Sequence, residues 1–345
     1  MKSNIYLHRF ALFTAICTFF LIIAGGVVTS TQSGLAVPDW PNTYGHFMFA
    51  FPLDQMVGGI FYEHSHRMIA SFVGFLTIIL TIWLWRREDR RWMRVLGFIA
   101  LGVVIAQGVL GGLTVLFLLP TPISVSHATL AQTFFAIVAS IALFTSRWSK
   151  SEQPTLYDEG KKIGLVQLSV FTTVAVYIQL ILGALMRHTQ SGLIVPDFPL
   201  AYGQLFPSLS PEALAQYNNQ LITSDIRLTA DGPITATQII IHILHRIWAI
   251  VVSILVVWTS FRLFKVSSKR VSRFAYILLG LLVIQMTLGA LTVLSVKSVT
   301  ITTAHVATGA LLLVTCVLTS LHTVKLYGVH FVRQIVPLSV REVAA

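Results

Sequence analysis

The sequence predicts an all-α membrane protein in which eight transmembrane helices form two tandem four-helix bundles related by a pseudo-twofold axis. Three observations lead to this prediction: the composition, eight apolar runs and an internal repeat. Of the 345 residues, 55% are hydrophobic and only 11% are charged, whereas soluble domains carry about 25% charged residues. The chain has two cysteines, both inside apolar runs, which excludes a disulfide framework and a Cys-rich metal site.

Each apolar run is long enough to cross the hydrocarbon core of a bilayer as a helix, which takes about 20 residues. The first run lacks a small-residue cleavage site and follows no Arg/Ser-rich presequence, so we expect a retained helix and neither a signal peptide nor a mitochondrial leader. The predicted spans are 10–30, 63–85, 95–117, 123–145, 163–187, 239–261, 274–294 and 300–323.

Basic residues gather in the segments between spans two and three, four and five, and six and seven. The positive-inside rule therefore places these three loops and both termini in the cytoplasm. The net charge of +11 is explained by this orientation, and it does not indicate nucleic-acid binding.

Two motifs of the first half of the chain return in the second half. Residues 31–41 (TQSGLAVPDWP) return as 189–199 (TQSGLIVPDFP), an offset of 158, and 107–115 (QGVLGGLTV) returns as 285–293 (QMTLGALTV), an offset of 178. The second outer loop therefore carries 20 additional residues, which we assign to its polar part around 208–235.

Each repeat contains an even number of spans, so the two copies have the same orientation and their symmetry axis runs along the membrane normal. The predicted organisation is an N-terminal bundle at 1–150, a cytoplasmic linker at 151–162, a C-terminal bundle at 163–325 and a cytoplasmic tail at 326–345.

Four histidines lie near the outer ends of spans that run inward, namely His66, His127, His245 and His305. Ionisable residues inside a span are costly and usually functional. Two histidines on facing helices at equal depth can ligate one haem iron from both faces, so we expect His66 to pair with His127 and His245 with His305. Small residues, including Gly111-Gly112 and Gly289-Ala290, leave room for a macrocycle. Zinc is a weaker alternative, because it usually takes three or four protein ligands. In another alternative, each histidine is a polar side chain that is satisfied at the end of its helix.

The first copy has Glu63 where the second has His242. Glu63 precedes His66 by about one turn on the same helix face, where a carboxylate could move protons or stabilise a developing cation. We therefore expect chemistry in the first half and an electron-carrying haem in the second. The alternative for Glu63 is a cap or dipole contact at the helix start. Arg67 and Arg246 are predicted to contact haem propionates, or else to snorkel to the interface.

The outer loops contain a repeated Val-Pro-Asp-aromatic-Pro motif with Asp39 and Asp197. Proline on both sides favours extended or turn backbone, and we expect each carboxylate to cap a short loop helix. Aromatic residues of the first loop suit either an interfacial lid or a belt at headgroup level. They are Trp40, Tyr44, Phe47, Phe49 and Phe51.

Together these features resemble the haem A synthase family of respiratory membranes. The resemblance covers the whole chain: eight spans, two similar halves, the Glu-x-x-His-Arg motif at 63–67, and histidines at 127, 245 and 305. It implies oxidation of the C8 methyl of haem O to a formyl group, by two hydroxylations and loss of water, to give haem A for terminal oxidases. It also implies that Glu63 is the catalytic glutamate, that His66 and His127 hold haem O, and that His245 and His305 ligate haem b.

The resemblance further implies a bacterial cytoplasmic (inner) membrane, an electron donor that the residues do not identify, and haem O as the substrate. Farnesylated haem is too apolar to diffuse through water, so we expect it to come from the bilayer or from haem O synthase, a prenyltransferase. Some bacterial members have a cysteine pair in the first outer loop, but residues 31–62 contain none. A loop disulfide is therefore excluded.

The residues alone indicate a duplicated bis-histidine haem protein, and the C8 chemistry rests on the resemblance. Two alternatives stay open. One is a bis-histidine cytochrome b that relays electrons with quinone, which would leave Glu63 unexplained. The other is a protein that binds or carries haem without changing it.

Overall fold

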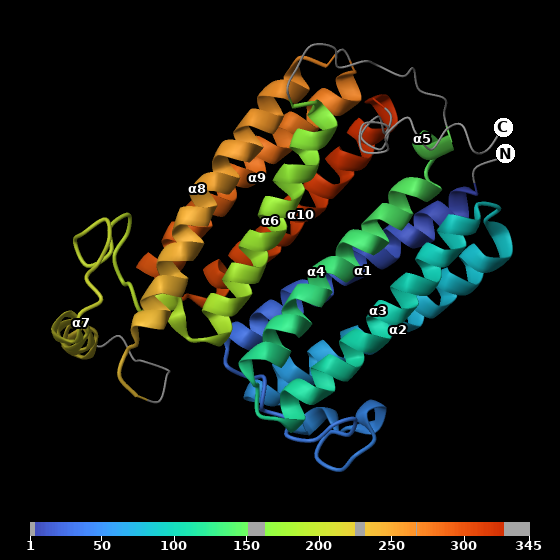
Figure 1. Cartoon of the computed structure of the whole chain (residues 1–345). Coiled ribbons are helices and arrows are strands. Elements are labelled where there is room, and N and C mark those ends of the chain that lie inside the picture. The colour runs from blue at the N-terminus through green and yellow to red at the C-terminus, as the bar shows by residue number, and fades with distance from the viewer. Residues whose placement is uncertain (1–3, 151–162, 225–231, 267, 328–345) are drawn as a thin grey trace, which may run out of the picture.

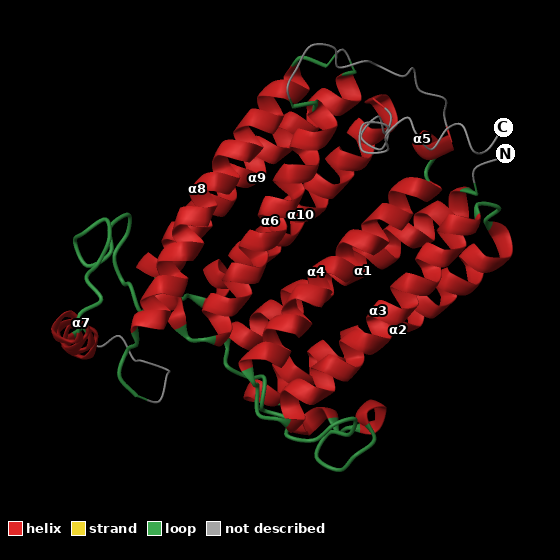
Figure 2. Ribbon diagram, viewed as in Figure 1, coloured by secondary structure: helices red, strands yellow, loops and turns green. Residues whose placement is uncertain are grey.

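The computed structural model describes residues 4–150, 163–224, 232–266 and 268–327, and within these residues the regular structure is helical (Figure 2). Eight helices are long and apolar enough to cross a membrane, which confirms the predicted number of spans. The predicted linker 151–162 and most of the predicted tail 326–345 lie outside the described residues. The eight long helices are α1 (Ile5–Ser30), α2 (Gly58–Arg87), α3 (Arg91–Leu116), α4 (Thr121–Thr145), α6 (Leu165–His188), α8 (Ala236–Phe264), α9 (Lys269–Leu294) and α10 (Val299–Tyr327).

Contacts between helices divide the long helices into two sets of four (Figure 1). In the first set α1 and α3 each contact both α2 and α4, so that α2 and α4 lie on a diagonal. In the second set α6 and α9 each contact both α8 and α10, which form the corresponding diagonal. The two sets meet where α1 and α4 contact α10 and where α4 contacts α6. The arrangement as two tandem four-helix bundles with a pseudo-twofold relation stays a prediction.

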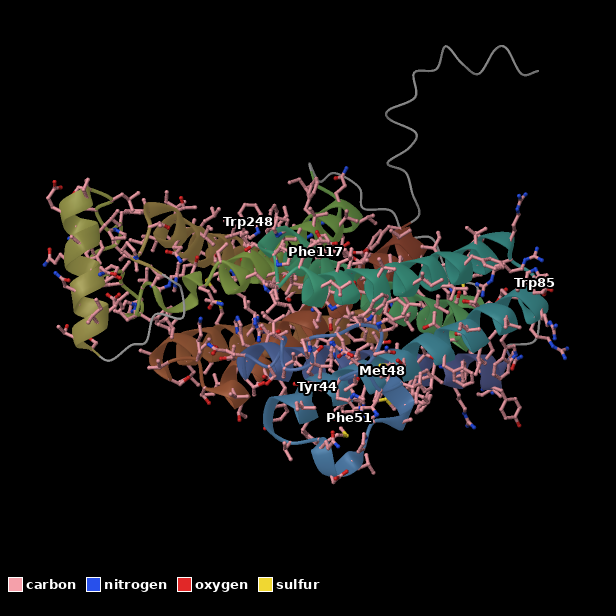
Figure 3. All side chains as sticks on the ribbon, turned by 90° about the horizontal axis from the view of Figure 1, so that it is seen from below. Tyr44, Met48, Phe51, Trp85, Phe117 and Trp248 are labelled. Carbon is pink, nitrogen blue, oxygen red and sulfur yellow. The ribbon has the colours of Figure 1, made fainter. Side chains whose placement is uncertain are left out.

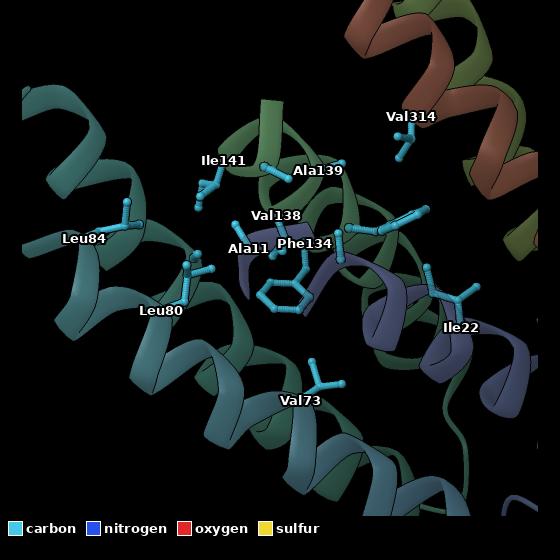
Figure 4. Close-up of a cluster of buried hydrophobic side chains, with 14 of the residues drawn as sticks. Ala11, Ile22, Val73, Leu80, Leu84, Phe134, Val138, Ala139, Ile141 and Val314 are labelled. Carbon is cyan, nitrogen blue, oxygen red and sulfur yellow. The ribbon is translucent and has the colours of Figure 1, made fainter. Parts of the chain in front are cut away.

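The buried apolar cores hold the inner parts of both sets together. In the first set the core surrounds Phe134 of α4, which packs with Val73 and Leu80 of α2 (Figure 4). In the second set Val252 of α8 and Leu313 of α10 belong to one buried cluster. On each of the four helices that carry the predicted histidines, the core residues follow the histidine in the chain, so they lie further from the outer loops than the histidine does. The cores therefore fix the helices and leave the outer ends free to form a site.

The outer loops lie at the end of the molecule opposite the start of α1 and the end of α10 (Figure 1). The first outer loop contains two short 3-10 helices, η1 (Met48–Ala50) and η2 (Leu53–Gln55), and η3 (Ser191–Leu193) opens the second. A four-residue helix, α5 (Arg147–Lys150), follows α4 at the opposite end. Cys17 and Cys316 are both free.

The additional segment of the second outer loop forms α7 (Pro211–Thr223). Ser210 caps the helix, because its side chain accepts a hydrogen bond from the backbone of Ala213, and proline occupies the first turn, as is usual at helix starts. Tyr217 stacks on Tyr202 with ring centroids 3.7 Å apart. The insertion that the sequence marks only as polar is thus a helix packed on the loop.

Candidate functional site

The four predicted histidines form one pair within each set of helices. His66 of α2 and His127 of α4 come from diagonal helices, and their imidazoles interact electrostatically. His245 of α8 and His305 of α10 do the same in the second set. All four side chains are partly buried. The structure therefore brings together both pairs that the repeat predicts.

A glycine on a neighbouring helix lies against each of these imidazoles. A Cβ built on the glycine would lie 3.1 or 3.2 Å from the Cε1 of the histidine, which is closer than an ordinary contact. A larger residue would therefore push the ring out of place. The pairs are Gly25 with His66, Gly111 with His127, Gly183 with His245, and Gly289 with His305.

Sequence reasoning identified Gly111 and Gly289 but missed Gly25 and Gly183. Gly25 and Gly183 are 158 positions apart, which is the offset of the repeated loop motif, and this repeat could have identified them. Sequence reasoning also missed the role of three glutamines, each of which precedes one of these glycines by four residues. Where α1 would have the fourth glutamine, it has Leu21.

The three glutamine amides bond to the histidine-bearing segments. The Nε2 of Gln107 donates to the backbone oxygen of His127 at 3.0 Å. The Nε2 of Gln179 donates to the backbone oxygen of His245 at 3.1 Å and also lies 3.1 Å from its ring Nε2. The Nε2 of Gln285 lies 3.4 Å from the Nε2 of His305. These amides fix the turns that present the imidazoles.

Among the described residues, eight of the twelve buried polar atoms without a hydrogen-bond partner belong to the paired histidines, to the three glutamines or to threonines two or three residues from a paired histidine. Each such atom costs about 1–3 kcal/mol when water is excluded, so the arrangement favours a bound group between the helices. A flat macrocycle whose metal accepts two axial imidazoles fits this set. The atoms are His66 Nδ1, Gln107 Oε1, His127 Nδ1 and Thr129 Oγ1 in the first set, and Gln179 Oε1, Gln285 Oε1, Thr302 Oγ1 and His305 Nδ1 in the second.

No group of three or more His, Cys, Asp or Glu side chains that could hold a metal ion occurs among the described residues. The structure therefore offers no additional protein ligands near either pair for the zinc alternative, because zinc takes at least three.

Glu63 is buried and forms a salt bridge with Arg67, its Oε1 accepting from Nε at 3.0 Å. α2 begins at Gly58 with Val57 as its N-cap, so Glu63 lies in the second turn and does not cap the helix. The carboxylate shares a helix face with His66. It is the one buried acid near the histidine pairs in the described parts of the chain.

In the second set, His242 occupies the repeat position of Glu63 and contacts a backbone oxygen instead of an arginine. The Nδ1 of His242 lies 2.8 Å from the backbone oxygen of Ser191, and the side chain is 1% exposed. In the part of the chain that the structure describes, a buried carboxylate is therefore present beside one histidine pair and absent beside the other.

Arg67 and Arg246 both hold the outer loops. Arg67 donates to the backbone oxygens of Val37, Asp39 and Asn42 at 2.8–3.1 Å. Arg246 donates to those of Val195, Asp197 and Leu200 at 2.7–3.3 Å, which are the same three loop positions at an offset of 158. Three hydrogen bonds of each guanidinium thus go to an outer loop, and propionate contacts of these arginines stay a prediction.

The prediction that Asp39 and Asp197 cap loop helices is wrong, because each closes a turn of its own loop. Asp39 accepts from the backbone N–H groups of Tyr44 and Gly45 at 2.8 Å, and Asp197 does so from Tyr202 and Gly203. Burial opposes ionisation of Asp39. The two N–H donors and the Arg67 guanidinium outweigh it and hold the pKa of Asp39 below its usual range.

The aromatic residues of the first outer loop divide between a lid and an exposed surface. The ring of Trp40 lies on Gly112 of α3, where a Cβ would come within 2.5 Å of it. Phe51 is buried against His64 and lies beside Tyr44 (Figure 3). Phe47 and Phe49 are exposed, as a belt at headgroup level requires. The loop therefore supports both readings, each with different residues.

Replacing Arg246 with leucine is expected to loosen the second outer loop, because three charge-assisted hydrogen bonds to backbone oxygens are lost at about 1.5–3 kcal/mol each. Limited proteolysis from the outer side should cut residues 195–200 faster than in the wild type. The matched control is Arg273→Leu, which removes an exposed arginine of α9 at the opposite end. Equal cleavage in both variants would contradict the anchoring role.

Comparisons with known proteins give one consistent result. A family model described as cytochrome oxidase assembly protein (COX15-CtaA) matches residues 8–317. A protein of Lysinibacillus sphaericus named "Heme A synthase" is 29% identical over 219 residues, which are 63% of this chain and 69% of that protein. One of Halalkalibacterium halodurans with the same name is 31% identical, over 59% and 68% of the two chains. One of Shewanella oneidensis is 25% identical over 88% and 92%.

Proposed function

Because the chain belongs to the cytochrome oxidase assembly protein family, we propose that it is a haem A synthase, a membrane oxidoreductase that converts haem O into haem A. The observation that carries the proposal is an asymmetric repeat. Two equivalent histidine pairs are present, but a buried carboxylate, Glu63, accompanies only the first. Relatives named "Heme A synthase" support the same activity.

The repeat also suggests how the two halves divide the work. We assign His66 and His127 to the iron of the substrate haem O, and His245 and His305 to a resident haem b. Bound there, haem b would supply one-electron transfer. The proposal is supported by the glycine against each of the four imidazoles, because a Cβ at that position would crowd the ring. The first half, 1–150, is then the catalytic domain, and 163–325 is the electron-carrying domain.

Glu63 is the group that we assign to proton transfer. Conversion of a methyl to a formyl group proceeds through hydroxymethyl and gem-diol stages and ends with loss of water. Each of the two hydroxylations removes two electrons from the carbon and therefore requires an external oxidant such as O2. Each stage changes protonation at the reacting carbon or its oxygen, which a nearby carboxylate can assist by 10²–10⁴-fold. Arg67 orients this carboxylate, and the loop carbonyls that Arg67 also binds make its position depend on the closed loop.

Eight membrane-crossing helices make the protein a multi-pass membrane protein. We propose the bacterial inner membrane, with both termini cytoplasmic and the histidine pairs near the outer surface, because the basic loops lie at the opposite end of the helices. The exposed apolar helix surfaces face lipid. Substrate then enters from the bilayer or from haem O synthase, and co-purification with that prenyltransferase would test the second route.

The test of the proposal is expression in cells that make haem O but lack a haem A synthase, followed by extraction and chromatography of the haems. We expect haem A or its hydroxymethyl precursor to appear, and cells with an empty vector provide the control. Unchanged haem O, with two haems bound to the protein, would support the quinone-linked cytochrome or the haem carrier instead.

A further inference from the structure

Two cations lie at the outer end of the second set of helices without a carboxylate partner. Arg187 is in the last turn of α6, and its Nη2 donates to the backbone oxygen of Gly26 and to Ser30 Oγ of α1 at 2.9 and 3.0 Å. Lys297 is in the turn between α9 and α10. Its side chain covers Gly192, where a Cβ would lie 2.7 Å from Cε. Among the described residues neither cation is in a salt bridge, and Lys297 Nζ has no hydrogen bond to the protein.

Both cations are placed above the histidine pair of the same half. Arg187 follows Gly183, the glycine that contacts His245, by four residues, which is ~6 Å further out along α6. Lys297 precedes α10, the helix that carries His305, and interacts electrostatically with both Arg187 and His242. Two positive charges therefore lie close to each other at the outer end of the second set of helices.

The first half has the same backbone but not the same charges. Leu119 stands at the position of Lys297, and both residues adopt a left-handed conformation with φ of 59°. Each backbone N–H donates to the carbonyl five residues earlier. The methyl groups of Leu119 lie 3.6 Å from a Cβ built on Gly34, the counterpart of Gly192. The turn therefore folds with leucine, and its geometry does not require a lysine.

The other cation is also missing from the first half, since Thr29 stands where α6 has Arg187. Burying unpaired cations is costly unless an anion joins them. Burial, together with the charge of Arg187, lowers the pKa of Lys297 to about 8. The second half has thus acquired two costly charges at a place where the first half has none.

We infer that Arg187 and Lys297 bind the two propionate carboxylates of the haem held by His245 and His305. This inference rests on the proposed haem b site in the second half. A guanidinium and an ammonium suit carboxylates, and the outer mouth is where the polar edge of a haem would lie. The first site has Thr29 and Leu119 instead and lacks this anchor. That difference suits a resident cofactor in one half and a product that must leave in the other.

The experiment measures how fast haem leaves the purified holoprotein for an excess of apomyoglobin. A His245→Ala variant identifies the absorbance change that belongs to the second site. We expect Lys297→Met and Arg187→Leu each to release second-site haem roughly tenfold to a hundredfold faster, the loss expected for one charge-assisted hydrogen bond. Lys297→Arg should stay within about threefold of the wild type. Leu119→Met, the matched change in the first half, should leave second-site release unchanged.

Two results would overturn the inference. One is a second-site release rate that Lys297→Met leaves unchanged. The other is loss of bound phospholipid phosphorus in that variant at an unchanged release rate, which would assign the cations to a lipid headgroup phosphate. A wild-type protein that holds no haem at the second site would instead reject the proposed haem b site itself, so the two failures are distinguishable.

Discussion

Replacing Glu63 with glutamine is expected to lower the formation of haem A by at least about a hundredfold while both haem sites stay filled. Glutamine keeps the shape of the side chain and removes its negative charge and its ability to take up a proton. Arg67 retains its three backbone partners in the outer loop, so the loop should stay closed. Quantified haem products from cells making haem O, together with the haem content of the purified variant, provide the measurement.

The repeat offers a matched control for this variant. His242 occupies the same helical position in the second half and pairs with a loop carbonyl, so His242→Gln should leave product formation within about twofold of the wild type. Loss of second-site haem in the Glu63→Gln protein would contradict the division of labour between the halves. Full product formation in that protein would remove Glu63 from the chemistry.

The fold was predictable because its governing force is simple. In a bilayer every backbone polar group must be satisfied within the span, so a long apolar run specifies a helix. Eight such runs predicted eight spans, and the structure contains all eight. It extends several of them past the predicted ends, as in α2, which continues through Arg87, since a helix can project beyond the hydrocarbon core.

The candidate site was predictable only where the repeat placed chemistry at matching depths. The histidine pairs came from that argument. The partners of Arg67 and Arg246 did not, because they are backbone oxygens of a distant loop, and a carbonyl has no sequence signature. Helix α7 was missed for another reason: the inserted segment was assigned by its polar character alone, although Leu214, Tyr217 and Leu221 recur at helical spacing and pack on the loop.

Arg187 shows a further limit of reading the repeat. The comparison of the halves covered the shared motifs and the difference between Glu63 and His242, but it did not extend to Arg187, which has Thr29 at its repeat position. Arg187 and Lys297 are 110 positions apart in the chain, yet the fold brings them close enough to interact electrostatically. Differences between the copies therefore carry as much functional information as their similarities.

The second large effect is expected for His245→Ala, which should remove the low-spin haem of the second half. Bis-imidazole ligation needs both rings, and Gln179, which bonds to this segment, cannot replace the lost nitrogen as an iron ligand of equal strength. Visible absorption of the purified variant, with the pyridine haemochrome as a measure of haem content, should show one low-spin haem fewer per protein. Product formation should fall with it, because the proposed electron carrier is gone.

Chemical rescue separates loss of a ligand from loss of the fold. Alanine at position 245 leaves a space the size of an imidazole beside Gly183, which contacts the ring in the wild type. Added imidazole should therefore restore the low-spin spectrum in His245→Ala, and should do so poorly when Gly183→Val also fills that space. Retention of a complete low-spin spectrum in His245→Ala without added imidazole would show that His305 is paired with some other ligand. The asymmetry between the halves would then need an explanation that does not begin from His245.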